Sequence, residues 1–293
     1  MHIKNMGERM LIYFKQKTKQ EKKRLLFCIA IVLILITGFV LTKRYISKYK
    51  TMQTSAVQDI SFNDVLATTS TPLINNKPNR RANIILACEK INGTILMPND
   101  TFSFNQIVGI RTEAKGFKPA PCFMDGKICD SIGGGVCQVS STLYYACLLS
   151  DFNIISRKNH SMSPDYLEMV GIDCTVSCDE DIDYKFENNT NNPIKIFVWV
   201  EEARVYVKIV GTKLNNNTIF IENEILSTIP YETIYRDNLN LVAGEEKVIQ
   251  PGFTGYLVKT YRVTKDENGN IISRKLEAKS DYKKLDAIIE HSY

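Results

Sequence analysis

An uncharged run of 17 residues, Leu25–Leu41, constrains this chain more than any other stretch of its sequence. A buried helix of a soluble protein is the alternative, which the absence of any polar face disfavours. The length of the run is at the lower end of what a helix needs to cross a bilayer, and no small-residue cleavage pattern of a secretory signal follows it. We therefore expect a single-pass transmembrane signal anchor at residues 25–42.

Both flanks of this predicted anchor are basic, and the N-terminal flank is the more basic of the two. Residues 1–24 carry eight Lys or Arg against two Glu, whereas the whole chain has a formal net charge of +5, so the remainder sums to −1. Because the more basic flank of an anchor stays in the cytoplasm, we expect a cytoplasmic tail at 1–24 and extracellular domains from residue 43 onward. The nearly neutral body offers no basic stripe for phosphates, so we expect no nucleic-acid partner.

The pattern after the anchor predicts a polar stalk at 43–59 and two folded regions, at 60–213 and 219–293. Apolar residues at helical spacing predict helices over 81–91 and 136–149. Strand-like patterns occur at 94–97, 171–178, 183–188, 194–200 and 204–210. We therefore expect an α+β fold: a single N-terminal transmembrane helix, a mixed α/β domain with a β-rich second half, and a small all-β C-terminal module.

Seven of the eight cysteines follow the predicted anchor, so at least one of them has no partner within the extracellular part. Asp125-Gly126 is typical of a two-residue hairpin turn, which would place Cys122 opposite Cys129. Their Cα atoms would then lie ~5.5 Å apart, which allows either a disulfide or a reduced, packed pair. Cys174 and Cys178 would lie ~13 Å apart on one strand, too far to bond each other.

The sharpest motif is Gly-Gly-Gly-Val-Cys-Gln at residues 133–138, which places Cys137 in the first turn of a predicted helix. Glycines allow positive φ angles and a close approach to a ligand. The amides and the dipole at the start of a helix stabilise a thiolate, and the same amides are able to hold a developing oxyanion. We therefore predict that Cys137 is a nucleophile. Residues expected to line its substrate site are Gly134, Gly135, Gln138, Ser140 and Arg157.

A catalytic thiolate needs a base, and the predicted extracellular part has two histidines, His160 and His291. His291 lies close to the end of the chain, whereas His160 follows the helix that carries Cys137. We predict that His160 is the general base and that Asp173 orients it. Other acids near His160 in the sequence remain alternatives for that role: Asp165, Asp179 and Asp183.

Two other interpretations of these residues are open. In the first interpretation, Cys137 has no chemical role and packs in the core as a small apolar residue. The second is a zinc site built from His160, Cys174 and Cys178, which the strand spacing of the two cysteines disfavours. We therefore expect no metal and no cofactor.

Residues 60–213 resemble a VanW domain, a family named from vancomycin-resistance gene clusters. The resemblance rests on the segments Arg81–Ile84, Ile91–Thr94, Phe102–Asn105, Gly133–Tyr144, Asn159–Ser161 and Gly171–Asp173. Cys174 departs from the pattern, because the family usually has alanine there. Residues 219–293 are similar to the G-five module of bacterial wall proteins, through Pro230–Thr233, Asp237–Leu239 and Gln250–Gly252.

This resemblance implies a role at the cell wall. VanW domains include peptidoglycan L,D-transpeptidases that use a cysteine, and G-five modules are elongated β-structures that contact wall glycans or act as spacers. Together with the motif at Cys137, it predicts an enzyme that cross-links the third residues of peptidoglycan stem peptides through a cysteine thioester. The expected partners are stem peptides, glycan and the cell membrane. A non-catalytic peptidoglycan-binding wall protein and a cysteine peptidoglycan hydrolase are the alternatives.

Overall fold

The computed structural model describes residues 62–74, 77–124 and 127–293, with only the backbone between 123 and 129, together with scattered positions between 18 and 43. The chain divides into two compact units, Met1–Ile60 and Ser61–Tyr293. Among the described residues, no helix combines the length and the apolar character needed to span a bilayer. Most of the predicted anchor at 25–42 and of the predicted stalk at 43–59 lies outside the described residues.

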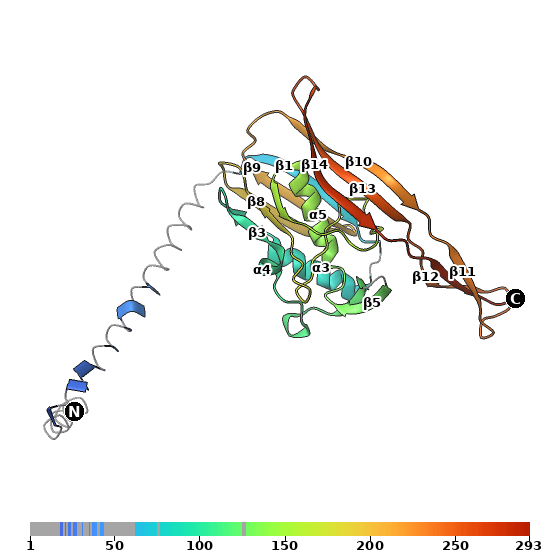
Figure 1. Ribbon diagram of the computed structural model, residues 1–293, viewed down its shortest axis with the longest axis horizontal. Helices are drawn as coiled ribbons and strands as arrows, with labels where there is room; N and C mark the ends of the chain where they lie inside the picture. The colour runs from blue at the N-terminus through green and yellow to red at the C-terminus, as the bar shows by residue number, and fades with distance from the viewer. Residues whose placement is uncertain are drawn as a thin grey trace. The chain divides into compact units, whose positions relative to one another are not determined.

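A four-stranded antiparallel sheet with the order β1-β9-β8-β2 forms the centre of the second unit (Figure 1). Its strands are β1 (Asp64–Pro72), β9 (Arg204–Gly211), β8 (Ile194–Glu201) and β2 (Ile95–Leu96). Side chains of a strand alternate between the two faces of a sheet, so every second residue is buried. Val198 and Val207, which face each other across β8 and β9, belong to the buried face. The strands predicted at 94–97, 194–200 and 204–210 are confirmed.

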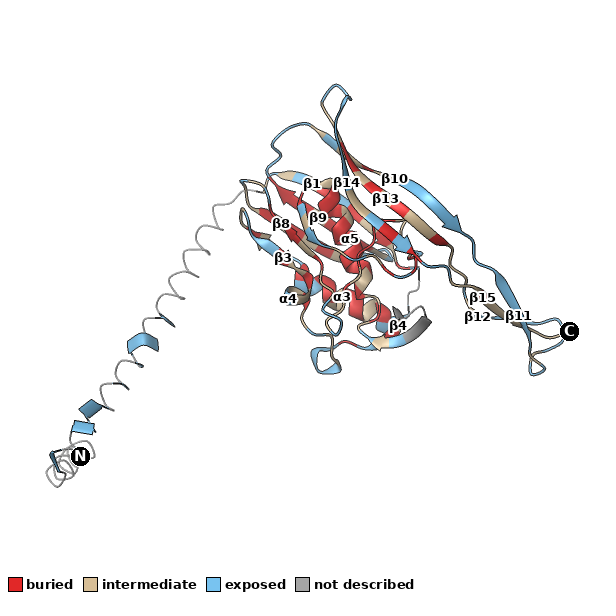
Figure 2. Cartoon of the chain, in the orientation of Figure 1, coloured by how far each residue is buried: buried red, intermediate tan, exposed pale blue. Residues whose placement is uncertain are grey.

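Two helices cover this buried face, α3 (Pro78–Ile91) and α5 (Val136–Leu149) (Figure 2). Both predicted helices are therefore confirmed. Helix α3 begins three residues before the predicted start, because Pro78 suits the first helical position, where no N–H is needed. Helix α5 buries the stripe that helical spacing predicts, formed by Val136, Val139, Leu143 and Ala146.

Shorter elements surround the two helices. They are β3 (Thr101–Ser103), α4 (Phe104–Val108), the 3-10 helix η1 (Glu113–Lys115), β4 (Pro119–Met124), β5 (Lys127–Ile132), β6 (Asn153–Ser156) and β7 (Lys185–Glu187). Strands β3, β7 and β6 form a small sheet whose stacked Phe102 and Phe186 rings, 5.0 Å apart, join the core. The β4–β5 hairpin has the predicted register, with Cys122 opposite Cys129. The side chain of Cys129 lies outside the described residues, so the state of this pair stays a prediction.

The strand predicted over 171–178 is wrong. This segment is irregular and carries only the isolated bridges Lys158–Thr175 and Ser177–Ile182. The backbone of Cys174 is held by α5 instead: its N–H donates to Ser141 Oγ at 2.9 Å, and its carbonyl accepts from Ser140 Oγ at 2.6 Å. Alternating apolar residues predict burial here correctly, but the hydrogen bonds go to helix side chains and a neighbouring loop.

The C-terminal region is all-β, as predicted. Its strands are β10 (Thr218–Ile229), β11 (Thr233–Asp237), β12 (Glu246–Gln250), β13 (Gly255–Lys265), β14 (Ile271–Tyr282) and β15 (Ala287–His291). They form two three-stranded sheets, β10-β13-β14 and β11-β15-β12, the second with β11 parallel to β15. Figure 2 shows that β11 is exposed along its length, whereas β13 and the end of β14 contain buried residues.

We expect Gly134→Ala to destabilise the protein by about 3 kcal/mol, because the new Cβ would lie 2.2 Å from the backbone oxygen of Ala120. Gly269→Ala is a matched control: it adds a methyl group in open space, and its φ of +84° costs only about 1 kcal/mol of backbone strain. Thermal unfolding followed by circular dichroism measures both changes. Equal melting temperatures for the two variants would contradict the close approach at Gly134.

Candidate active site

The glycine run places Cys137 at the start of α5, as its sequence predicts. Gly133 and Gly135 have φ angles of +86° and +101°, which side chains rarely adopt, and Gly135 is the N-cap of the helix. Cys137 follows in the first turn, and its side chain is partly exposed. The thiol therefore lies where the positive end of the helix dipole favours an anion.

The surroundings of the Cys137 thiol favour its ionised form. Burial by itself would raise the pKa of Cys137, but hydrogen bonding to His160, the charge of His160 and the backbone of Val176 outweigh burial, so that its pKa is lowered. The Val176 amide lies 3.5 Å from the sulfur and donates to it. Arg111 contributes a smaller electrostatic effect in the same direction.

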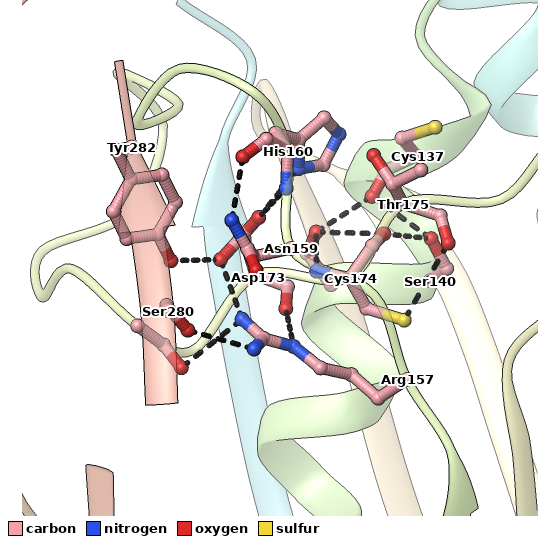
Figure 3. Close-up of polar contacts among 12 residues, drawn as sticks. Cys137, Ser140, Arg157, Asn159, His160, Asp173, Cys174, Thr175, Ser280 and Tyr282 are labelled. Carbon is pink, nitrogen blue, oxygen red and sulfur yellow. Dashed lines mark hydrogen bonds and ion pairs between the residues drawn. The ribbon is translucent and has the colours of Figure 1, made fainter. Parts of the chain in front are cut away.

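The His160 ring lies between Asp173 and Cys137 (Figure 3). Asp173 Oδ2 lies 2.6 Å from His160 Nδ1 and accepts a second hydrogen bond, of 2.7 Å, from the His160 backbone N–H. This pairing fixes the orientation of the ring. Burial would lower the pKa of His160, but Asp173 and Cys137 raise it to about 9.

Asp173 is fully buried and remains ionised. Burial would raise its pKa, but hydrogen bonding to His160, the charges of His160 and Arg157 and a hydrogen bond from Tyr282 lower it to about 2. Of the alternative acids, Asp183 is engaged elsewhere, because its carboxylate accepts from Ser103 Oγ at 2.6 Å. The structure therefore brings together the three residues predicted to be catalytic.

The charges of these groups set the chemistry that the arrangement supports. A lowered thiol pKa and a raised imidazole pKa favour a thiolate–imidazolium pair at neutral pH. The thiolate is the nucleophilic form of cysteine, and the imidazolium is able to protonate a leaving group. The arrangement suits nucleophilic attack on a carbonyl carbon followed by expulsion of an amine.

Gln138 and Ser140, predicted as substrate contacts, have packing roles instead. Gln138 is buried, accepts from Arg80 Nη2 at 2.9 Å and donates to Thr71 Oγ1 at 2.9 Å. Ser140 is buried and donates to the carbonyls of Cys137 and Cys174. Because α5 is buried on nearly all sides, its polar side chains are used to satisfy the interior.

Arg157 positions Asp173 rather than lining a substrate pocket. Its Nε donates to the Asp173 carbonyl at 2.7 Å, and its Nη2 pairs with Oδ1 at 2.8 Å. Gly134 is buried and its carbonyl accepts from Asn83 Nδ2 at 3.0 Å, so it shapes the turn. Gly135 is partly exposed beside Cys137, and its contact with substrate stays a prediction.

Two amides of the helix start are already engaged. Val136 N–H donates to the Gly133 carbonyl at 3.2 Å, and Gln138 N–H donates to the Gly135 carbonyl at 3.0 Å. Neither amide is able to hold a developing oxyanion without breaking that bond. The oxyanion site predicted at the start of the helix therefore cannot use the Val136 and Gln138 amides while these two hydrogen bonds are in place.

The buried cysteines contrast with Cys137. Burial raises the pKa of Cys88 to about 12, and it also raises those of Cys147 and Cys174. Cys174, the departure from the VanW pattern, is therefore a packed thiol next to Asp173. Within the described part of the chain, no group of three or more His, Cys, Asp or Glu side chains is arranged to hold a metal ion.

Several residues of the site escape sequence reasoning. Val176 acts through its backbone, and Arg111 belongs to a different loop. Tyr282 and Ser280 lie more than a hundred residues beyond Asp173, in the C-terminal module. None of these positions carries a pattern that marks it, because only the fold brings them to the site.

Two parts of this chain match known protein families. Residues 79–210 match the family described as "VanW like protein", and residues 222–290 match the G5 domain. The chain carries a VanW-like domain followed by a G5 domain. The G5 domain coincides with the all-β module, and the VanW-like domain contains Cys137, His160 and Asp173.

Two curated proteins are similar to the chain. YoaR of Bacillus subtilis, itself uncharacterized, is 44% identical over 40% of this chain and 38% of its own length. The vancomycin B-type resistance protein VanW of Enterococcus faecalis is 28% identical over 57% of this chain and 64% of its own length. The chain thus spans less than two thirds of the length of either relative.

Two solved G5 domains are similar to part of this chain. The HP0197 G5 domain is 17% identical, covers 26% of this chain and 99% of its own length, and has a TM-score of 0.16. The G5 domain of an IgA1 protease is 22% identical, covers 28% of this chain and 98% of its own length, and has a TM-score of 0.17.

Below pH 7, we expect iodoacetamide to modify Cys137 faster than it modifies glutathione, the reference thiol in the same solution. The lowered pKa of Cys137 keeps its thiolate populated at a pH where an ordinary thiol, with a pKa of about 8.5, is protonated. Peptide mapping by mass spectrometry, with initial rates measured from pH 5 to 9, gives the profile. If the labelling rate of Cys137 rises over the same pH range as that of glutathione, the thiolate is not activated and the prediction is contradicted.

We expect Asp173→Asn to slow this modification at pH 6 at least about tenfold, because each unit of thiol pKa changes the thiolate ratio tenfold. The amide no longer raises the pKa of His160, so the imidazolium that stabilises the thiolate is lost. Asp165→Asn is the matched control, since Asp165 is exposed and nearby in sequence. If Asp165→Asn slows labelling and Asp173→Asn does not, Asp173 is the wrong acid.

Proposed function

We propose that this protein is a cysteine-dependent acyltransferase, a peptidoglycan L,D-transpeptidase that joins the third residues of neighbouring stem peptides. The observation that carries this proposal is the Cys137–His160–Asp173 arrangement, with a lowered thiol pKa and a raised imidazole pKa. The VanW-like domain and the G5 domain support a substrate in the cell wall.

The first half-reaction forms a thioester. The Cys137 thiolate attacks the carbonyl carbon of the third residue of a donor stem, and a carbon–sulfur bond forms. The amide bond to the terminal D-alanine then breaks. The departing amine takes a proton from the His160 imidazolium, so free D-alanine leaves and a neutral imidazole remains.

The second half-reaction transfers the acyl group. A side-chain amine on the third residue of a neighbouring stem attacks the thioester carbon, and neutral His160 accepts its proton. The carbon–sulfur bond breaks, which regenerates the Cys137 thiolate and the imidazolium. Attack by water in place of the amine would give a hydrolase with the same first half-reaction.

The proposed location is the outer face of the cell membrane. The uncharged run Leu25–Leu41 and its basic N-terminal flank support a single-pass anchor with a cytoplasmic tail. In this arrangement the VanW-like and G5 domains lie outside, where the stem peptides are. The G5 domain would then contact wall glycan.

We expect the purified full chain to convert disaccharide tetrapeptides into dimers with release of D-alanine, both detected by mass spectrometry. Cys137→Ala should abolish both products while circular dichroism shows retained folding. Cys147→Ala, which removes a buried thiol from the same helix, is the matched control and should retain both. Dimers formed by Cys137→Ala would remove Cys137 from the mechanism.

The products also separate the candidate functions. Release of D-alanine with tripeptides but without dimers identifies a hydrolase. Binding of tetrapeptides without release of D-alanine identifies a non-catalytic wall-binding protein.

We expect cross-linking to fall as the pH rises above about 9. The pKa of His160 is raised to about 9, so above that value the imidazolium loses the proton that the leaving amine needs. Initial rates of D-alanine release measured at pH values below and above 9 test this expected fall. A rate that keeps rising past pH 10 would show that His160 does not supply this proton.

A further inference from the structure

The C-terminal module is packed against the two loops that carry the site. Asn159 Nδ2 donates to the Asp281 carbonyl at 2.9 Å, and the Lys283 N–H donates to the Ser161 carbonyl at 2.7 Å. Thr260 Oγ1 on β13 donates to the Gly171 carbonyl at 3.2 Å. Asn159 and Ser161 flank His160 in the sequence, and Gly171 lies two residues before Asp173.

A second group of contacts extends the same interface. Arg262, almost fully buried on β13, pairs with Asp151 at 2.5 Å and donates to the Phe152 carbonyl at 3.0 Å. Asn223 on β10 donates to the Val170 carbonyl. The module therefore contacts the VanW-like domain through three of its strands.

The deepest contacts reach Asp173 itself (Figure 3). The Tyr282 hydroxyl, at the end of β14, donates to Asp173 Oδ1. Ser280 Oγ accepts from Arg157 Nη1 at 2.7 Å, and the same guanidinium pairs with Oδ1. Ser280 and Tyr282 are both buried. One donor to Oδ1, Tyr282, thus belongs to the C-terminal module, and the other, Arg157, is hydrogen-bonded to it.

We propose that the C-terminal module completes the candidate active site, with Tyr282 and Ser280 as positioning residues that fix the Asp173 carboxylate from the side opposite His160. This inference rests on the proposed function of Cys137. It gives the G5 domain a role in the chemistry that is separate from any contact with wall glycan.

The physical reason lies in the freedom of an aspartate side chain. The terminal torsion of aspartate has a broad preference, so hydrogen-bond donors must fix its two oxygens. Oδ2 is held by two donors of His160, and Oδ1 is held by Arg157 and Tyr282. If Oδ1 is released, the carboxylate is able to turn, and the orientation of the His160 ring is no longer fixed.

The ionisation of the network points the same way. Burial and the nearby Asp173 raise the pKa of Tyr282, so its hydroxyl keeps its proton and remains a donor. A carboxylate that loses a donor protonates at higher pH, and a protonated carboxylate no longer supports the imidazolium. The titratable groups that interact with Asp173 are Arg157 and His160 on one loop, Cys174 beside it, Tyr144 on α5, Tyr166, and Tyr282 on β14.

Removal of a single hydroxyl tests this role in the full chain. We expect Tyr282→Phe to slow iodoacetamide labelling of Cys137 at pH 6 about tenfold, which is the effect of one hydrogen bond to a charged group. The acid limb of the labelling profile, where the rate falls as the pH is lowered, should move to higher pH. The kcat of cross-linking should fall by a similar factor with KM unchanged. Tyr261→Phe is the matched control, because it removes a hydroxyl that donates to exposed Glu224 at 2.8 Å in the same module.

The outcomes separate this inference from the proposed function. If Cys137 in the unmodified chain labels like glutathione, the proposed function fails, and this inference fails with it. If the unmodified chain is activated and Tyr282→Phe has the same labelling profile and kcat, only the inference is overturned, even if the melting temperature falls. Should Tyr282→Phe not fold, Ser280→Ala takes its place: a shifted acid limb supports the inference, and an unchanged limb overturns it.

Discussion

The Asp173 carboxylate has no exposure to solvent, and four hydrogen bonds replace the water that it would otherwise need. A buried charge without such partners would take up a proton. Here the donors keep it ionised, and the ionised form raises the pKa of His160. The imidazolium in turn lowers the pKa of Cys137. The reactivity of the thiol therefore depends on how well one carboxylate is held.

The same interior separates one reactive thiol from several inert ones. Cys137 and Cys147 belong to a single helix, yet burial raises the pKa of Cys147 while the pKa of Cys137 is lowered. The difference comes from position in α5: Cys137 lies in its first turn beside His160, whereas Cys147 lies near its end among apolar side chains. Composition alone would not distinguish them.

Much of the local structure follows from the sequence. The helix over 136–149 and the hairpin register opposite Cys122 depend on spacing and turn chemistry, which act over a few residues. The segment 171–178 does not follow, because apolar alternation reports burial without reporting which groups take the backbone hydrogen bonds. The roles of Gln138 and Arg157 could not be predicted from the sequence for a similar reason. A polar side chain near a catalytic motif either contacts substrate or forms hydrogen bonds in the interior, and the residues that pack around it decide which.

The sequence by itself determined the chemistry that is available: a cysteine after three glycines at the start of a helix, a histidine shortly after that helix, and several acids nearby. The tertiary structure decided which acid serves His160, which amides are already engaged, and that the far end of the chain reaches the site. The reason is physical. Helix starts and turns are set by neighbouring residues, whereas the donors around a buried carboxylate come from wherever packing brings them, here from a strand more than a hundred residues away.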